Sequence, residues 1–212
     1  MKRLTTTRQR SLAFTGIALC LALAALSPRA VAMGAGGTET VRSLYDTLLQ
    51  TMRNGATLGS HGRYAQVEPV VRRLFDISFM TRLAVGPQWE GLSEAQRRDV
   101  SQAFEHYIAA IYADRFDSYA GERLQVTGEQ ASAGGTVITS QIVKSNGEPV
   151  SINYLMHQNG GLWQIADVYL DGTISELATR RSEFAAILHT QGIAGLIETL
   201  NTKASTLSAR AS

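Results

Sequence analysis

The chain has 212 residues, of which 44% are hydrophobic and 18% are charged, and its formal net charge is +2. That length suits one domain, or one domain with a small appendage. Five of the 20 basic residues and none of the 18 acidic residues fall in positions 1–32, so residues 33–212 carry a net charge of −3, which argues against nucleic acid as a partner.

Residues 1–32 are predicted to be a secretory signal peptide. A basic start precedes the apolar run Leu12–Leu26, and Ala30-Val31-Ala32 has the small residues of a cleavage site. The apolar run has about 15 residues, fewer than the ~20 that a spanning helix needs, so we expect export rather than a membrane anchor. Cys20 is the single cysteine, and the bulky Leu19 before it makes it a poor lipidation site; the mature chain then has no disulfide and no thiolate ligand.

Apolar residues at helical spacing predict four helices in the first half of the domain. Thr38, Asp76 and Ser93 are suitable N-caps, and Ser93 with Gln96 makes a capping box. The predicted helices are Thr38–Met52, Arg63–Phe75, Ile77–Val85, and a long one from Ser93 to about Phe116 with an aromatic apolar face.

The period then changes to alternation, which predicts an antiparallel meander. The expected strands are Glu122–Glu129, Thr136–Lys144, Pro149–Gln158 and Leu162–Leu170. Asn146-Gly147 and Gly160-Gly161 supply hairpin turns. Thr173, with Glu176 three residues later, is expected to cap a helix to Leu188, and a last helix is expected over 193–203, followed by a flexible tail over 204–212. The predicted class is α+β, with a four-stranded curved antiparallel sheet between N-terminal and C-terminal helices.

Residues suited to catalysis are scarce. The four histidines, His61, His106, His157 and His189, lack metal-ligand spacing, and no nucleophile elbow, Walker A loop or dinucleotide fingerprint is present. We therefore expect no catalytic residue, metal or cofactor. Asp167 interrupts an apolar strand, and a buried carboxylate is costly unless it is paired, so Arg181 on the following helix is its predicted structural partner. An alternative is that Asp167 or Asp171 acts as a base in a cavity.

Several motifs resemble the toluene-tolerance family of periplasmic phospholipid-binding proteins, which includes MlaC-like proteins. They are the segment Trp163–Ser175, Arg181-Ser-Glu-Phe184, Gly192–Leu200, Gly86-Pro-Gln-Trp89 and Asn146–Tyr154, and the resemblance covers roughly Val41–Lys203. Phe116–Arg123 and Asp167–Ser175 with Thr179–Phe184 are most similar to the branch associated with hopanoid biosynthesis, HpnM.

The resemblance implies an NTF2-like cone over residues 33–203 with an apolar pocket. It implies a periplasmic carrier that shuttles phospholipid, or a hopanoid, between the inner and outer membranes. Its partners would be an inner-membrane lipid transporter and an outer-membrane acceptor or donor. The expected lipid-binding residues are Phe79, Leu83, Tyr107, Ile108, Ile111, Tyr112, Phe116, Ile152, Tyr154, Trp163, Ile165, Val168, Ile174, Phe184 and Leu188.

Two other functions stay open at this stage. One is an NTF2-like enzyme that uses Asp167 or Asp171, and the other is a structural protein whose apolar residues only fill a core, because periodicity alone cannot separate a core from a pocket lining. A cavity between the long helix and the sheet would favour the carrier.

Overall fold

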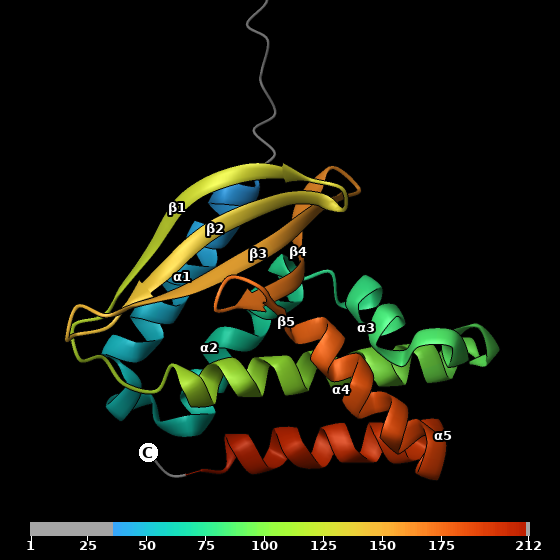
Figure 1. Cartoon of the computed structure of the whole chain (residues 1–212). Coiled ribbons are helices and arrows are strands. Elements are labelled where there is room, and N and C mark those ends of the chain that lie inside the picture. Colours follow the sequence, from blue (N-terminus) through green and yellow to red (C-terminus); the bar gives the residue numbers. More distant parts are fainter. Residues whose placement is uncertain (1–35, 211–212) are drawn as a thin grey trace, which may run out of the picture. The chain divides into compact units, whose positions relative to one another are not determined.

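A computed structural model describes residues 36–210, which form an α+β fold (Figure 1). The predicted signal peptide and its cleavage site lie outside the described residues. The helices are α1 (Gly37–Arg53), α2 (Gly55–Leu74), α3 (Ile77–Val85), α4 (Glu94–Arg115) and α5 (Glu176–Ser208), with a short 3₁₀ helix, η1 (Gly86–Gly91). The strands are β1 (Arg123–Ser132), β2 (Gly135–Val143), β3 (Pro149–Asn159), β4 (Leu162–Leu170) and β5 (Ile174–Ser175).

The five strands form one antiparallel meander in the order β1-β2-β3-β4-β5. The α+β class with a curved antiparallel sheet is confirmed, although the sheet has five strands rather than the predicted four; the NTF2-like cone remains a prediction. Register shifts interrupt the β1–β2 and β3–β4 ladders. Such irregularities bend strands, which accounts for an arched sheet that stands away from α4.

The fifth strand also changes the start of α5. Asp171 and Gly172 turn the chain with φ values of 48° and 78°, and Ile174–Ser175 then returns to pair with Leu170 and Tyr169. Thr173 is the last residue of this turn and its N–H donates to the Leu170 carbonyl at 3.1 Å, so the predicted cap at Thr173 is wrong. Ser175 caps α5 instead, because its hydroxyl accepts from the N–H of Ala178 at 2.9 Å.

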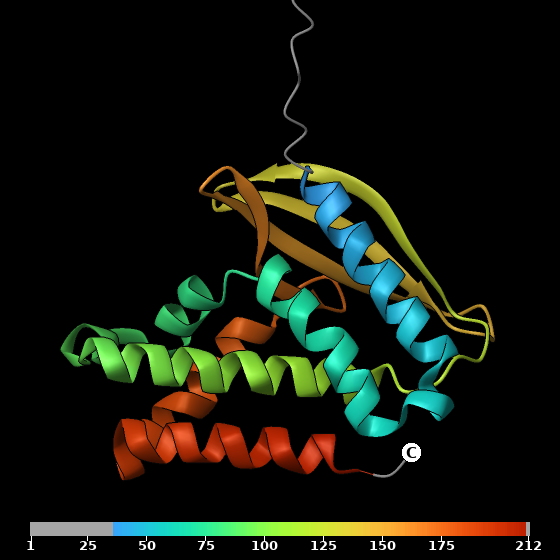
Figure 2. The same ribbon diagram turned by 180° about the vertical axis from the view of Figure 1, so that it is seen from behind.

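Helix α1 lies along the concave face of the sheet, and α4 crosses below the sheet between it and the second half of α5 (Figures 1 and 2). The predicted cap at Asp76 and the capping box at Ser93 are confirmed. Thr38 is not a cap: α1 begins one residue earlier, and the Thr38 hydroxyl donates to Glu129 Oε2 at 2.8 Å.

Two glycines divide long helices. Gly59 has φ 61° inside α2, and Gly192 has φ 64° inside α5. Residues other than glycine rarely adopt this backbone conformation. Helix α2 therefore begins well before the predicted Arg63 and contains Pro69. The kink at Gly192 separates the two predicted C-terminal helices, but the second continues to Ser208, past the predicted end at Lys203. Within residues 36–210, no helix combines the length and the apolar character that crossing a bilayer would require.

Candidate functional site

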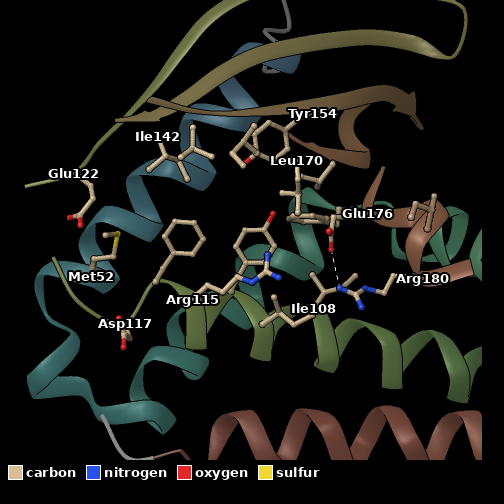
Figure 3. A pocket seen from close by; sticks show the side chains of 18 of the residues that line it. Met52, Ile108, Arg115, Asp117, Glu122, Ile142, Tyr154, Leu170, Glu176 and Arg180 are labelled. Carbon is tan, nitrogen blue, oxygen red and sulfur yellow. Dashed lines mark hydrogen bonds and ion pairs between the residues drawn. The ribbon is translucent and has the colours of Figure 1, made fainter. Parts of the chain in front are cut away.

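A cavity of about 420 Å³ lies between the sheet, α4 and the start of α5 (Figure 3). This volume falls within the range of sites for small molecules. Its apolar wall is formed by Met52, Phe75, Met80, Phe104, Ile108, Ile111, Tyr112, Phe116, Ile142, Val150, Ile152, Tyr154, Val168, Leu170 and Leu177. The polar lining consists of Arg115, Asp117, Ser118, Glu122, Lys144, Glu176 and Arg180.

The wall follows directly from the two backbone periods. Val150, Ile152 and Tyr154 are two residues apart on β3, so their side chains share one face of the sheet. Phe104, Ile108, Ile111 and Tyr112 are three or four residues apart on α4 and form one stripe on the helix. Because the sheet arches away from α4, these two apolar surfaces face each other across the cavity, where they remain available to a guest.

Tyrosine hydroxyls provide a neutral polar patch within the apolar wall. Tyr154 interacts through its hydroxyl with Tyr45 and Tyr112, and Tyr45 Oη lies 2.5 Å from Ser140 Oγ. The Tyr112 ring packs edge-on against Phe75 and stacks on Phe116, with centroid distances of 5.6 and 5.8 Å. Burial raises the pKa of Tyr112 and of Tyr154 above the ordinary tyrosine value, so both hydroxyls stay protonated and neutral.

The two ends of the cavity differ in how their charged groups are paired and in exposure. At the α5 end, Arg180 pairs with Glu176 and with Glu183 at 2.9 Å each, and its guanidinium lies 5.5 Å from the centre of the Tyr107 ring. The Arg180 side chain is only 13% exposed. At the other end, which we call the mouth, the charged residues are Arg115, Asp117, Glu122 and Lys144; Arg115 and Lys144 are exposed.

Comparison with known proteins identifies the fold that encloses this cavity. The family model described as MlaC protein matches residues 42–202. The chain belongs to the MlaC family. Among solved structures, it is similar to a phospholipid-binding protein from Ralstonia solanacearum, determined in complex with a phospholipid. The TM-score is 0.68 at 20% identity, and the match covers 80% of this chain and 97% of that one. At this identity the likeness shows a shared fold.

Seven of the residues predicted to bind lipid line the cavity of this MlaC-family fold: Ile108, Ile111, Tyr112, Phe116, Ile152, Tyr154 and Val168. The others lie outside the lining. Phe79, Tyr107, Trp163, Ile165, Phe184 and Leu188 pack in or against the core, whereas Leu83 and Ile174 are 38% and 53% exposed. Contact of any of them with a lipid stays a prediction.

Sequence reasoning missed part of the wall and both charged ends. Val150 continues the β3 alternation and Phe104 continues the α4 stripe, so these two could have been found. Met52 lies on α1, Phe75 directly follows the end of α2, and Met80 lies on α3, so only the tertiary arrangement brings them to the cavity.

The predicted Asp167–Arg181 ion pair is not among the ion pairs of residues 36–210. Asp167 is 6% exposed and satisfies its carboxylate with other partners. Oδ1 accepts from the N–H groups of Val168 at 2.7 Å and Leu177 at 3.0 Å, and Oδ2 accepts from the Ser175 hydroxyl at 2.6 Å. The carboxylate therefore stabilises the N-terminus of α5, where partial positive charge favours an anion. Neither Asp167 nor Asp171 lines the cavity.

Other polar clusters also have local partners. His157 Nε2 lies 2.7 Å from Asp76 Oδ2, which also accepts from the Asn159 side chain at 2.9 Å. In the described part of the chain, Glu68, Glu105 and His106 come close enough together to share a metal ion. Both carboxylates, however, already pair with Arg72, so an ion-pair network is enough to explain why these side chains lie together.

Proposed function

We propose that this protein is a periplasmic carrier for a phospholipid, which it holds with an acyl chain inside the cavity and the headgroup at the mouth. The single observation that carries the proposal is an apolar cavity between α4 and the arched sheet, with charged groups at its ends. Each CH₂ removed from water contributes about 0.8 kcal/mol, so a chain of ~14 carbons would cost ~11 kcal/mol to expose. An enclosed apolar wall removes most of that penalty.

Two findings support this proposal. The chain is a member of the MlaC family, and a solved protein with the same fold was determined with a phospholipid bound. Export through a signal peptide over residues 1–32 would put the carrier in the periplasm. There it would shuttle lipid between an inner-membrane transporter and an outer-membrane donor or acceptor.

Release of the lipid requires an opening step, because a partner can shift a carrier only if it binds the open and closed forms with different affinities. Met80 on α3 and Leu177 with Arg180 on α5 line the cavity. Movement of either helix start would widen the cavity. We therefore propose α3 and the first turns of α5 as the gating elements.

A hopanoid is the second candidate guest, suggested by the resemblance of Phe116–Arg123 and Asp167–Ser175 to the HpnM branch. Its fused rings are rigid, whereas an acyl chain can bend to follow an irregular wall. Lipid extraction from protein isolated from its native host separates the two, because phospholipids and hopanoids differ in mass.

The proposal is tested by filling the cavity. Ile111→Trp adds a large side chain to the wall on α4, and Ile187→Trp adds the same side chain at a half-buried site on α5 outside the lining. Both proteins, checked for folding by melting temperature, are titrated with a fluorescent phospholipid. We expect Ile111→Trp to weaken binding at least tenfold and Ile187→Trp to bind as the parent does. Equal binding by the two variants would contradict the proposed site.

A further inference from the structure

The charges at the two ends of the cavity indicate which end holds the headgroup. At the α5 end, the cation that lines the cavity is Arg180, and its guanidinium is already shared by two carboxylates, Glu176 and Glu183. A lipid phosphate placed there would have to displace Glu176 or Glu183 from Arg180, and the displaced carboxylate would repel it in a half-buried setting where charges are screened weakly. The α5 end is therefore unsuitable for a phosphate.

The mouth offers a cation that is free to bind phosphate. Lys144 is held by Glu148 at 3.0 Å in the β2–β3 turn. Arg115, in the last turn of α4, takes part in no ion pair or side-chain hydrogen bond with the other residues of 36–210. A guanidinium binds phosphate oxygens through two parallel hydrogen bonds, so Arg115 is the group best suited to hold a phosphate at the cavity.

Two acidic groups also line the mouth. Figure 3 shows the Arg115 side chain extending along the cavity, while the carboxylates of Asp117 and Glu122 lie near Met52 at the mouth. Asp117 accepts only from the neighbouring Ser118 hydroxyl at 2.9 Å, and Glu122 from the N–H of Ala120 at 2.7 Å. Neither carboxylate has a cationic partner among the residues that the structure describes.

We propose that the mouth selects a zwitterionic headgroup, with phosphate on Arg115 and a terminal ammonium between Asp117 and Glu122. This inference rests on the proposed function. In an aminophospholipid the phosphate is nearest the acyl chains and the ammonium is farther out. The order of charges along the mouth, positive and then negative, complements that order. An anionic headgroup such as phosphatidylglycerol gains the Arg115 contact but brings no cation to the two carboxylates.

Competition between two lipids tests this selectivity. The protein is incubated with vesicles of equimolar phosphatidylethanolamine and phosphatidylglycerol with identical acyl chains, re-isolated, and its bound lipids are counted by mass spectrometry. We expect phosphatidylethanolamine to be in excess. The double variant D117N/E122Q should lower its ratio to phosphatidylglycerol about three- to tenfold, the size expected for two partly exposed charge contacts. Arg115→Gln should reduce loading of both lipids.

The matched control is D46N/D99N, which removes two exposed carboxylates outside the cavity lining and changes the net charge equally. Its lipid ratio should equal that of the parent. If the parent binds both lipids but D117N/E122Q leaves the ratio unchanged, or if phosphatidylglycerol is preferred, the zwitterion inference is wrong and the carrier proposal stands. If the parent binds neither lipid, the carrier proposal itself fails. Glu122→Lys gives a second reading if the double variant does not fold, because it should favour phosphatidylglycerol.

Discussion

Replacing Asp167 by Asn tests the conclusion that this carboxylate stabilises the start of α5 rather than pairing with Arg181. The substitution keeps the size of the side chain and removes its charge. An Asn oxygen can still accept from Val168 and Leu177, but its NH₂ group then faces the Ser175 hydroxyl, which already accepts from Ala178. One buried, charge-assisted hydrogen bond is lost, together with the interaction of an anion with the N-terminus of α5.

The expected loss can be worked from these contacts. A hydrogen bond to a charged group contributes about 1.5–3 kcal/mol, and the helix-terminus interaction adds about 0.3–1 kcal/mol. The free energy of unfolding should therefore fall by about 2–4 kcal/mol. For a domain of this size, each kcal/mol shifts the melting temperature by about 2–4 °C, so Asp167→Asn should melt roughly 4–16 °C below the parent.

Urea unfolding followed by circular dichroism measures this loss. Asp171→Asn is the matched control, because Asp171 is exposed in the preceding turn and its replacement removes the same charge. Arg181→Gln should also lie within about 0.5 kcal/mol of the parent, as surface substitutions usually do. A loss below 0.5 kcal/mol for Asp167→Asn, or an equally large loss for Arg181→Gln, would refute this account of Asp167.

Three further predictions concern the scaffold. Gly135→Ala should destabilise the protein far more than Gly147→Ala. Both glycines have positive φ, but an added Cβ at Gly135 would lie 2.1 Å from the carbonyl oxygen of Met156 on β3, whereas a Cβ at Gly147 would meet open space. The difference between the two urea midpoints therefore measures the effect of the clash. Burial raises the pKa of Tyr112 and Tyr154 above the ordinary tyrosine value of 10.0. The stability contributed by the neutral hydroxyls is therefore complete below pH 10 and is lost as pH rises through the raised pKa values, so the melting temperature should fall more steeply above pH 10 in the parent than in Tyr154→Phe. Ser93→Ala removes the α4 capping box and should cost about 1 kcal/mol in urea unfolding; no change would show that the cap is replaced by water.

Local patterns were sufficient for much of the fold. The bounds of α3 follow from Asp76 as cap and Gly86 as stop, and the β3 alternation predicts which side chains face inward. The predicted hairpins agree with the observed turns because glycine tolerates the positive φ of Gly147 and Gly160.

The misses share a physical cause, which is that tertiary contacts decide them. Ser175 replaces Thr173 as the cap because Ile174 and Ser175 first pair with β4, and local sequence propensity cannot predict this pairing. The partner of Asp167 was predicted from charge, but the backbone N–H groups at the start of α5 lie closer than Arg181. The charged mouth combines the end of α4 with residues before β1 and after β2, which no single periodic pattern joins.

The most direct test of the carrier proposal is native mass spectrometry of the protein purified from its own cell envelope without detergent. The proposal predicts a population heavier than the mature chain by the mass of one lipid, and loss of that population in Ile111→Trp but not in Ile187→Trp. A parent protein that carries no lipid, and takes none up from vesicles, would contradict it.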